Sequence, residues 1–177
     1  MSIGDTVRVK TFGRYYDTTH IIKNITDEGI ELTNITRLFS ASELEVVCTL
    51  KYPCIAVDLD DTLVESITYP YISSINLEAI SVLREYQSLG GEVIAFSCRS
   101  DNDLALAIEA ISEHGFKFDA INEDTQTSID RWLSIYPGAT MSPKPWCSLY
   151  IDDKAWPCNL IGIDWKKIRE TLLTRNN

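Results

Sequence analysis

The spacing of hydrophobic positions changes near residue 51, and the structure that it predicts changes with it. Before that point Val7 and Val9 alternate with polar neighbours, and short runs of the same kind recur around Ile30 and from Leu44 to Val47. Alternation with a period of two, interrupted by turn residues, is typical of β-strands. Residues 1–50 are therefore predicted to form a small all-β module of four or five short antiparallel strands.

Beyond residue 53, continuous apolar runs replace this alternation. They occupy residues 54–57, 93–96 and 149–151, which is the pattern of strands buried on both faces of a sheet. Segments long enough for helices separate the runs. Alternating strands and helices of these lengths predict a parallel sheet with helices on both faces, so residues 51–177 are expected to be an α/β domain.

Local signals place the helices. Asn76 is a suitable N-cap for one helix, which Gly90 and Gly91 end, and Asp101 or Asn102 is expected to cap the next. Apolar residues spaced three or four apart are predicted to face the core in each helix. These stripes are Leu77, Ile80, Leu83 and Tyr86 in the first helix, Leu104, Ile108 and Ile111 in the second, and Ile129, Trp132, Leu133 and Tyr136 in a third.

Polar residues follow each predicted parallel strand. They are Asp58, Asp60 and Asp61 after the first, Ser97, Cys98 and Arg99 after the second, and Asp152 and Asp153 after the last. Because ligand sites of such sheets lie beyond the carboxyl ends of the strands, these groups are expected to share one edge. Either acidic pair alone is more simply explained as a solvated loop, but their joint placement favours a site.

The nature of that site follows from its charge. Crowded carboxylates are unfavourable unless a counter-ion neutralises them. Mg²⁺ suits the residues present because it binds a few carboxylates together with waters and phosphate oxygens. The sequence therefore predicts a magnesium site held by Asp58, by the backbone carbonyl of Asp60, and by Asp152 or Asp153.

The same residues match the motifs of a known family. Asp58-x-Asp60-x-Thr62 after an apolar strand resembles the first motif of the haloacid dehalogenase (HAD) superfamily of phosphohydrolases, and Ser97 resembles the second. Lys144 is similar to the lysine of the third motif, and Asp152-Asp153 to the acidic fourth motif. Order and approximate spacing agree over residues 52–160. The resemblance implies a HAD-like Rossmannoid domain that hydrolyses a phosphorylated substrate, a phosphate monoester, through an aspartyl-phosphate.

The catalytic roles can be assigned from position. Asp58 stands directly at the strand end and is the predicted nucleophile. A carboxylate two residues further along an extended chain faces the same side, so Asp60 is the expected general acid and base. Asp61 is offset by one residue and is expected to point away. Lys144 is predicted to neutralise charge on the phosphoryl group, with Lys154 as its rival.

Four residues complete the predicted substrate-binding set: Thr62, Ser97, Cys98 and Arg99. Ser97 and a nearby backbone N–H are expected to hydrogen-bond the phosphoryl oxygens. Thr62 is better explained as stabilising the turn after the nucleophile. For Arg99, an ion pair with a helix carboxylate is at least as good an explanation as substrate contact.

The spacing also indicates an open site. Only 34 residues separate Thr62 from Ser97, which leaves room for a loop, a helix and a strand but not for the inserted cap domain of many HAD members. By family analogy, capless enzymes often act on macromolecular phosphates, including polynucleotide ends and phosphoproteins, although some take nucleotides. A net charge of −10 disfavours general binding to nucleic acid, although one phosphorylated end remains an option.

Two further predictions concern compartment and partners. The five cysteines form no Cys-x-x-Cys pair, and no apolar run approaches the roughly 18 residues that span a bilayer, so a cytoplasmic protein without membrane association is expected. The opening Gly4-Asp5-x-Val7-x-Val9 resembles SH3-like barrels, which implies a clamp for a protein or nucleic-acid partner. The alternative function is a non-catalytic HAD-like binding module, against which the presence of Asp60 argues.

Overall fold

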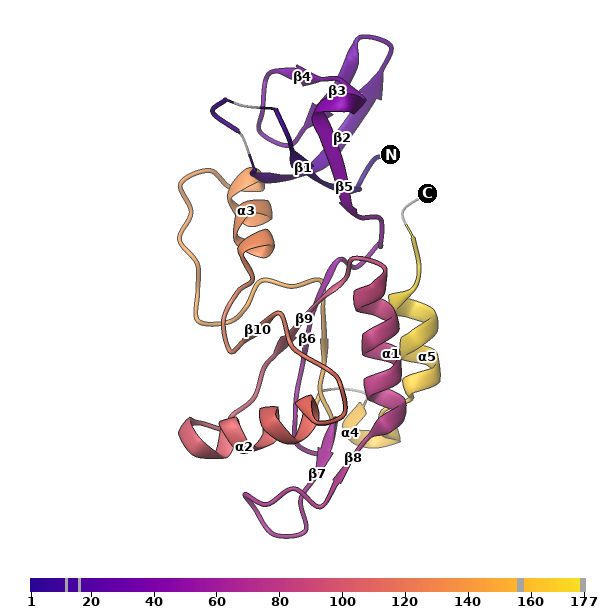
Figure 1. Ribbon diagram of the computed structural model, residues 1–177, viewed down its shortest axis with the longest axis vertical. Helices are drawn as coiled ribbons and strands as arrows, with labels where there is room; N and C mark the ends of the chain where they lie inside the picture. Colours follow the sequence, from indigo (N-terminus) through magenta and orange to yellow (C-terminus); the bar gives the residue numbers. More distant parts are fainter. Residues whose placement is uncertain (12, 16, 156–157, 176–177) are drawn as a thin grey trace.

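Two sheets of different topology organise the chain (Figure 1). The computed structural model describes residues 1–177 except 12, 16, 156, 157, 176 and 177. Among the described residues, an antiparallel sheet comes first in the chain, and a parallel sheet flanked by helices follows it. The mixed α/β architecture expected from the hydrophobic spacing is thereby confirmed.

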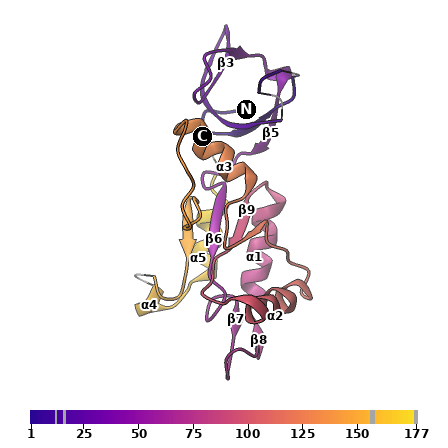
Figure 2. The same cartoon turned by 90° about the vertical axis from the view of Figure 1, so that its left-hand side faces the viewer.

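The first sheet contains five described strands in the order β4-β3-β2-β1-β5. They are β1 (Thr6–Val9), β2 (Thr19–Thr26), β3 (Gly29–Leu32), β4 (Leu38–Phe39) and β5 (Leu44–Cys48), and a 3₁₀ turn, η1 (Ala41–Glu43), joins the last two. Val7 and Val9 are buried, as their alternation predicts, and they pack with Ile22, Leu32 and Phe39 in a core of their own. In Figure 2 these strands curl round at the top of the molecule.

The second sheet is parallel and, within the described part of the chain, has the order β10-β9-β6-β11. Its strands are β6 (Cys54–Val57), β9 (Glu92–Ala95), β10 (Ala120–Ile121) and β11 (Leu149–Ile151). The four residues of β6 are all buried. The three apolar runs seen in the sequence are thus strands of one parallel sheet, with β6 between β9 and β11.

Five α-helices lie in the described part of the chain. They are α1 (Leu77–Ser88), α2 (Asp101–Ser112), α3 (Gln126–Ile135), α4 (Cys158–Ile161) and α5 (Trp165–Leu172). Ile55 and Val57 belong to a large cluster with buried residues of α1, α2 and α5, whereas Cys54 and Ala56 belong to a smaller one with Ile94. Alternate residues of β6 therefore enter different cores, as a strand buried on both faces requires.

The helix signals are confirmed in part. Ile80, Leu83 and Tyr86 of the α1 stripe are buried, but the prediction for Leu77 is wrong, because this residue in the first turn is 61% exposed. Asn76 caps α1 by accepting a hydrogen bond from the backbone N–H of Ala79, and Gly90 lies just beyond the helix with a positive φ. The predicted cap of α2 is wrong, because Ser100 occupies the N-cap position and Asp101 is already helical by hydrogen bonding. The same signal therefore located one helix start to the residue and the other to within one.

The stripe predicted for α3 is wrong. Leu133 and Tyr136 are 37% and 52% exposed, and the buried side chains of this helix are Ser128, Arg131 and Ser134. The reason is tertiary, because α3 contacts β2 and lies between the two sheets (Figure 2). The Ser134 hydroxyl lies 2.9 Å from that of Thr33, so a polar face is buried where an apolar one was expected.

A short hairpin extends beyond the carboxyl end of the parallel sheet. Its strands are β7 (Val64–Glu65) and β8 (Ser74–Ile75), and Figure 1 shows it at the bottom of the molecule. Between residues 62 and 97 the chain forms this hairpin, α1 and β9. These elements fill the segment, and the assignment to a capless type stays a prediction.

Candidate metal and phosphate site

Three carboxylates meet at the carboxyl edge of the parallel sheet. Asp58 follows β6, and Asp152 and Asp153 follow β11, the neighbouring strand in register with it. The Asp58 N–H donates to the Ile151 carbonyl at 2.9 Å, so the two strand ends are joined up to the point where the acidic residues begin. One carboxylate oxygen from each of the three residues lies within 4.8 Å of the others.

The electrostatics of this cluster are unfavourable without a cation. Burial and then the charges of Asp152, Asp153 and Asp60 raise the pKa of Asp58 to about 6, against the lowering effect of a hydrogen bond from the Leu59 N–H. The oxygen donors fit a hard divalent ion, which would relieve this repulsion. The residues present therefore suit Mg²⁺, with Asp58, Asp152 and Asp153 as its carboxylate ligands.

The loop after β6 is tightly wound. The N–H groups of Leu63 and Val64 both donate to the Leu59 carbonyl, and Asp61 has φ = 57°, a left-handed conformation that aspartate tolerates better than most residues. Leu59 and Leu63 are fully buried and anchor the turn. The Asp61 carboxylate is exposed and lies 3.6 Å from the Lys154 ammonium, consistent with the expectation that it points away.

Thr62 connects the two acidic loops. Its hydroxyl accepts a hydrogen bond from the Asp153 N–H at 3.2 Å, and the residue is 2% exposed. A hydroxyl enclosed in this way is poorly placed to touch substrate. Thr62 thus fixes Asp153 relative to the loop that carries Asp58, and the structural role considered for it is the one its contacts support.

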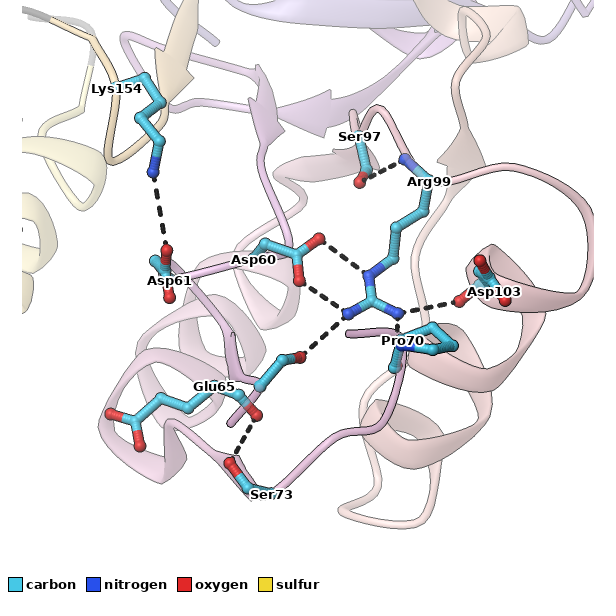
Figure 3. A network of polar contacts seen from close by, with 10 residues as sticks. Asp60, Asp61, Glu65, Pro70, Ser73, Ser97, Arg99, Asp103 and Lys154 are labelled. Carbon is cyan, nitrogen blue, oxygen red and sulfur yellow. Dashed lines mark hydrogen bonds and ion pairs between the residues drawn. The ribbon is translucent and has the colours of Figure 1, made fainter. Parts of the chain in front are cut away.

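Asp60 is held by a buried arginine (Figure 3). The Arg99 Nε and Nη2 atoms donate to the two Asp60 carboxylate oxygens at 2.8 and 2.7 Å. Arg99 also donates to the carbonyls of Pro70 and Asp103 and to the Ser66 hydroxyl, so its five N–H groups all have protein acceptors. The ion pair considered for Arg99 exists, although its partner is a loop carboxylate instead of a helix one.

The loop after β9 carries Ser97 and is fixed by Asn122, which follows β10. The Asn122 side chain accepts a hydrogen bond from the Ser97 N–H at 2.8 Å and donates one to the Ser97 carbonyl at 3.0 Å. The Ser97 hydroxyl accepts from the Arg99 N–H at 3.2 Å. Cys98 is exposed beside them. Ser97 and Cys98 thus lie on the loop next to Asp58, and their contact with phosphate stays a prediction.

The two candidate lysines lie in different surroundings. The Lys144 ammonium is 4.3 Å from the centre of the Tyr150 ring, beside a pocket of about 320 Å³ that Trp132 and Trp146 also line. It forms no ion pair with any carboxylate of the described residues. Lys154 contacts both Asp153 and Asp61. The structure therefore brings Lys154, and not Lys144, into direct contact with the acidic edge.

The sequence analysis did not predict that the hairpin contributes contacts to this site. Ser66 and Pro70 bond Arg99 from a segment whose strands have only two residues each, too short to show a period. The signal that could have located a turn there is Pro70, because proline is favoured in turns.

Comparisons with known proteins give one structural relative. A solved structure of a conserved protein from Bacteroides thetaiotaomicron is 33% identical, with a TM-score of 0.52, and the match covers 66% of this chain and 86% of that one. The chain therefore belongs to the same family as that conserved protein. No protein-family model matches the sequence, and no curated protein does so. Among the described residues, no helix combines the length and apolar character needed to cross a membrane.

Proposed function

We propose that this protein is a magnesium-dependent phosphomonoester hydrolase of the HAD type. The observation that carries the proposal is the convergence of Asp58, Asp152 and Asp153 within 4.8 Å at the end of a buried parallel strand. Clustered carboxylates at that place suit a bound divalent ion, and a phosphate group completes the coordination of such an ion readily. The HAD-like motif order supports the same activity.

The chain's own residues would divide the reaction as follows. An Asp58 oxygen bonds to phosphorus as the bond between phosphorus and the leaving oxygen breaks, and Asp60 gives that oxygen a proton. Asp60 then takes a proton from the water that attacks the phosphorus of the aspartyl-phosphate, which releases inorganic phosphate and restores Asp58. Bound Mg²⁺ would neutralise the charge of the transferred group. Lys144 or Lys154 and the Ser97 loop would add to that neutralisation.

The direct test is phosphate release from an aryl phosphate. Turnover should require Mg²⁺ and should fall by about 10³-fold or more in Asp58→Asn. Asp61→Asn is the matched control, because the Asp61 carboxylate is exposed, forms an ion pair with surface Lys154, and sits in a backbone conformation that asparagine also tolerates. Turnover that survives Asp58→Asn, or that needs no divalent ion, would remove this mechanism.

One observation favours the alternative, a non-catalytic module. Both oxygens of Asp60 are engaged by Arg99, and an acid–base group must release at least one of these bonds to exchange a proton. A module that only binds Mg²⁺ and a phosphorylated end would keep the pair closed. Thermal stabilisation by Mg²⁺ with no phosphate release from any ester would support the module over the enzyme.

The N-terminal sheet would serve as a partner clamp in either case. We propose that its strand order, with β1 between β2 and β5, belongs to an SH3-like barrel. The five cysteines are all free thiols, which fits a reducing compartment such as the cytoplasm. An experimental structure of the full chain would test this proposal by showing whether the sheet closes into a barrel.

A further inference from the structure

The hairpin beside the acidic edge ends in exposed apolar side chains. Its tip, residues 66–73, contains no charged residue, in a chain of which 24% is charged. Ile67 is 90% exposed, Tyr71 71% and Tyr69 57%. Exposed apolar groups concentrated on one short segment commonly mark a binding surface. The hairpin tip is therefore a candidate for contact with a ligand.

The hairpin tip is already ordered. Arg99 bonds the Pro70 carbonyl at 2.8 Å and the Ser66 hydroxyl at 3.0 Å. Within the hairpin, the Tyr71 N–H donates to the Thr68 carbonyl, and both the N–H and the hydroxyl of Ser73 donate to the Glu65 carbonyl. A surface fixed in advance loses little conformational entropy when a ligand binds.

The hairpin tip is also next to the reacting groups. The Tyr69 ring lies 4.8 Å from the Arg99 Cζ atom, and the same guanidinium holds the Asp60 carboxylate (Figure 3). One buried side chain thus sets the position of both the aromatic tip and the proposed proton donor for the leaving group. Whatever leaves from phosphate beside Asp60 departs close to this tip.

We infer that the hairpin tip is the leaving-group subsite of the proposed phosphatase and that it takes the base of a nucleoside monophosphate. This inference rests on the proposed function. A neutral planar base stacks on tyrosine rings, while the single phosphate goes to the carboxylates and their ion. A polyanionic strand would meet Glu65, Asp60 and Asp61 around the same subsite and be repelled.

Other phosphate esters match the hairpin tip less well. A sugar needs several hydrogen-bonding groups to fix its hydroxyls. The Ser66 and Ser73 hydroxyls of the tip already bond Arg99 and the Glu65 carbonyl, which leaves those of Thr68 and the two tyrosines. The nucleoside monophosphate puts a sugar between phosphate and base and so reaches the tip.

The experiment compares kcat/KM for adenosine 5′-monophosphate with that for glycerol 2-phosphate, with Mg²⁺, in the full-length protein. The wild type should prefer the nucleotide, and Tyr71→Ala should lower the ratio roughly 5- to 100-fold, as loss of one stacked ring does. Tyr71→Phe should keep the preference because the ring remains. Tyr136→Ala, which removes a half-exposed tyrosine from the far end of α3, should leave the ratio unchanged.

Each other outcome has a clear meaning. If the wild type hydrolyses both esters and Tyr71→Ala leaves their ratio unchanged, the inference fails and the proposed function stands. A preference for glucose 6-phosphate or phosphotyrosine over the nucleotide likewise overturns the base assignment alone. If the wild type hydrolyses no phosphate ester, the proposed function fails and takes the inference with it. Tyr71 is mostly exposed, so folding is expected to survive its replacement.

Discussion

The two ends of strand β6 have charged groups of opposite sign beside them: clustered carboxylates at the carboxyl end and a buried arginine at the start. At its carboxyl end, Asp58 faces two further carboxylates, and burial together with their charge raises its pKa to about 6. At its start, Cys54 lies near Arg131 of α3, a cation that is 1% exposed. The Nε and Nη2 atoms of Arg131 have no hydrogen-bond partner, and no carboxylate of the described residues forms an ion pair with it.

The difference between these ends lies in access. The three carboxylates are half-buried at the open edge of the sheet, so a cation can reach them and offset the repulsion between them. Arg131 is enclosed between the two sheets, where an unpaired charge only lowers stability. Uncompensated charge therefore points to a binding site only where a ligand can arrive. Arg99 is the third case, a buried charge whose five donors are all paired.

The largest expected effect on stability comes from breaking the ion pair between Arg99 and Asp60. Arg99→Met leaves Asp60 without its partner and frees the hairpin tip, and loss of one member of a buried ion pair costs about 3–5 kcal/mol. Because the Asp60 side chain is 35% exposed, we expect the lower end of that range. Urea denaturation measures the loss. A cost below about 1 kcal/mol would show that burial of Arg99 does not strengthen the pair.

The sequence predicts the carboxylates of the site, but it does not predict the residues that hold them in place. Asp58, Asp152 and Asp153 follow apolar runs that parallel pairing must bring side by side, so their convergence needs only the order of the strands. Arg99 joins Asp60 across 39 positions and bonds a hairpin with two-residue strands, and no local pattern encodes either contact.

The fold shows the same division. Helix α1 has a capping asparagine, a terminal glycine and, apart from Leu77, a buried apolar stripe, and these signals agree with one another, so its place was predictable. The apolar stripe of α3 predicts that its apolar face is buried, but contact with β2 buries the polar face of the helix instead. A contact between modules decides which side of that helix is covered. Periodicity within one helix cannot report it.

The next effect concerns pH and magnesium at the open end of β6. The folded-state pKa of Asp58, about 6, exceeds the unperturbed value of 3.8, so the folded chain binds more protons between these values. Stability of the metal-free protein should therefore fall as pH rises from about 4 to 7 and stay lower above that. Allowing for the partial exposure of Asp58, we expect a loss of about 1–2 kcal/mol.

Denaturation of metal-free Asp58→Asn should show a shallower pH slope than the wild type and greater stability at pH 7. Magnesium should reverse that order, because at a hundred times its Kd it stabilises the wild type by about 2.7 kcal/mol, more than the loss expected for the metal-free protein. An equal response of both proteins to Mg²⁺ would place the ion elsewhere and would weaken the contrast between the open and enclosed ends of β6.

Replacing the enclosed cation should cost nothing. Arg131→Met keeps a similar volume and removes a charge whose Nε and Nη2 atoms are unpaired. Replacing even a buried ion pair by apolar side chains is often neutral or stabilising by about 1–4 kcal/mol, so removing this cation should not lower stability. Because the Arg131 guanidinium also lies 5.7 Å from the Trp146 ring, we expect a gain near the lower limit. Urea denaturation beside Arg99→Met makes the comparison, and a clear loss of stability would mean that Arg131 is paired after all.

The smallest expected effect is the loss of an exposed ion pair, which has the same hydrogen-bond geometry as the Arg99 pair and so separates the effect of burial from that of geometry. Arg169 of α5 grips Glu85 of α1 with Nε and Nη2, as Arg99 grips Asp60, but the two side chains are 48% and 40% exposed. Surface pairs contribute about 0–1 kcal/mol and are screened by salt, so Arg169→Met should cost less than about 1 kcal/mol, and less still in 0.5 M NaCl. Measured beside Arg99→Met, an equal loss would mean that two-point hydrogen bonding, and not enclosure, makes the Arg99 pair strong.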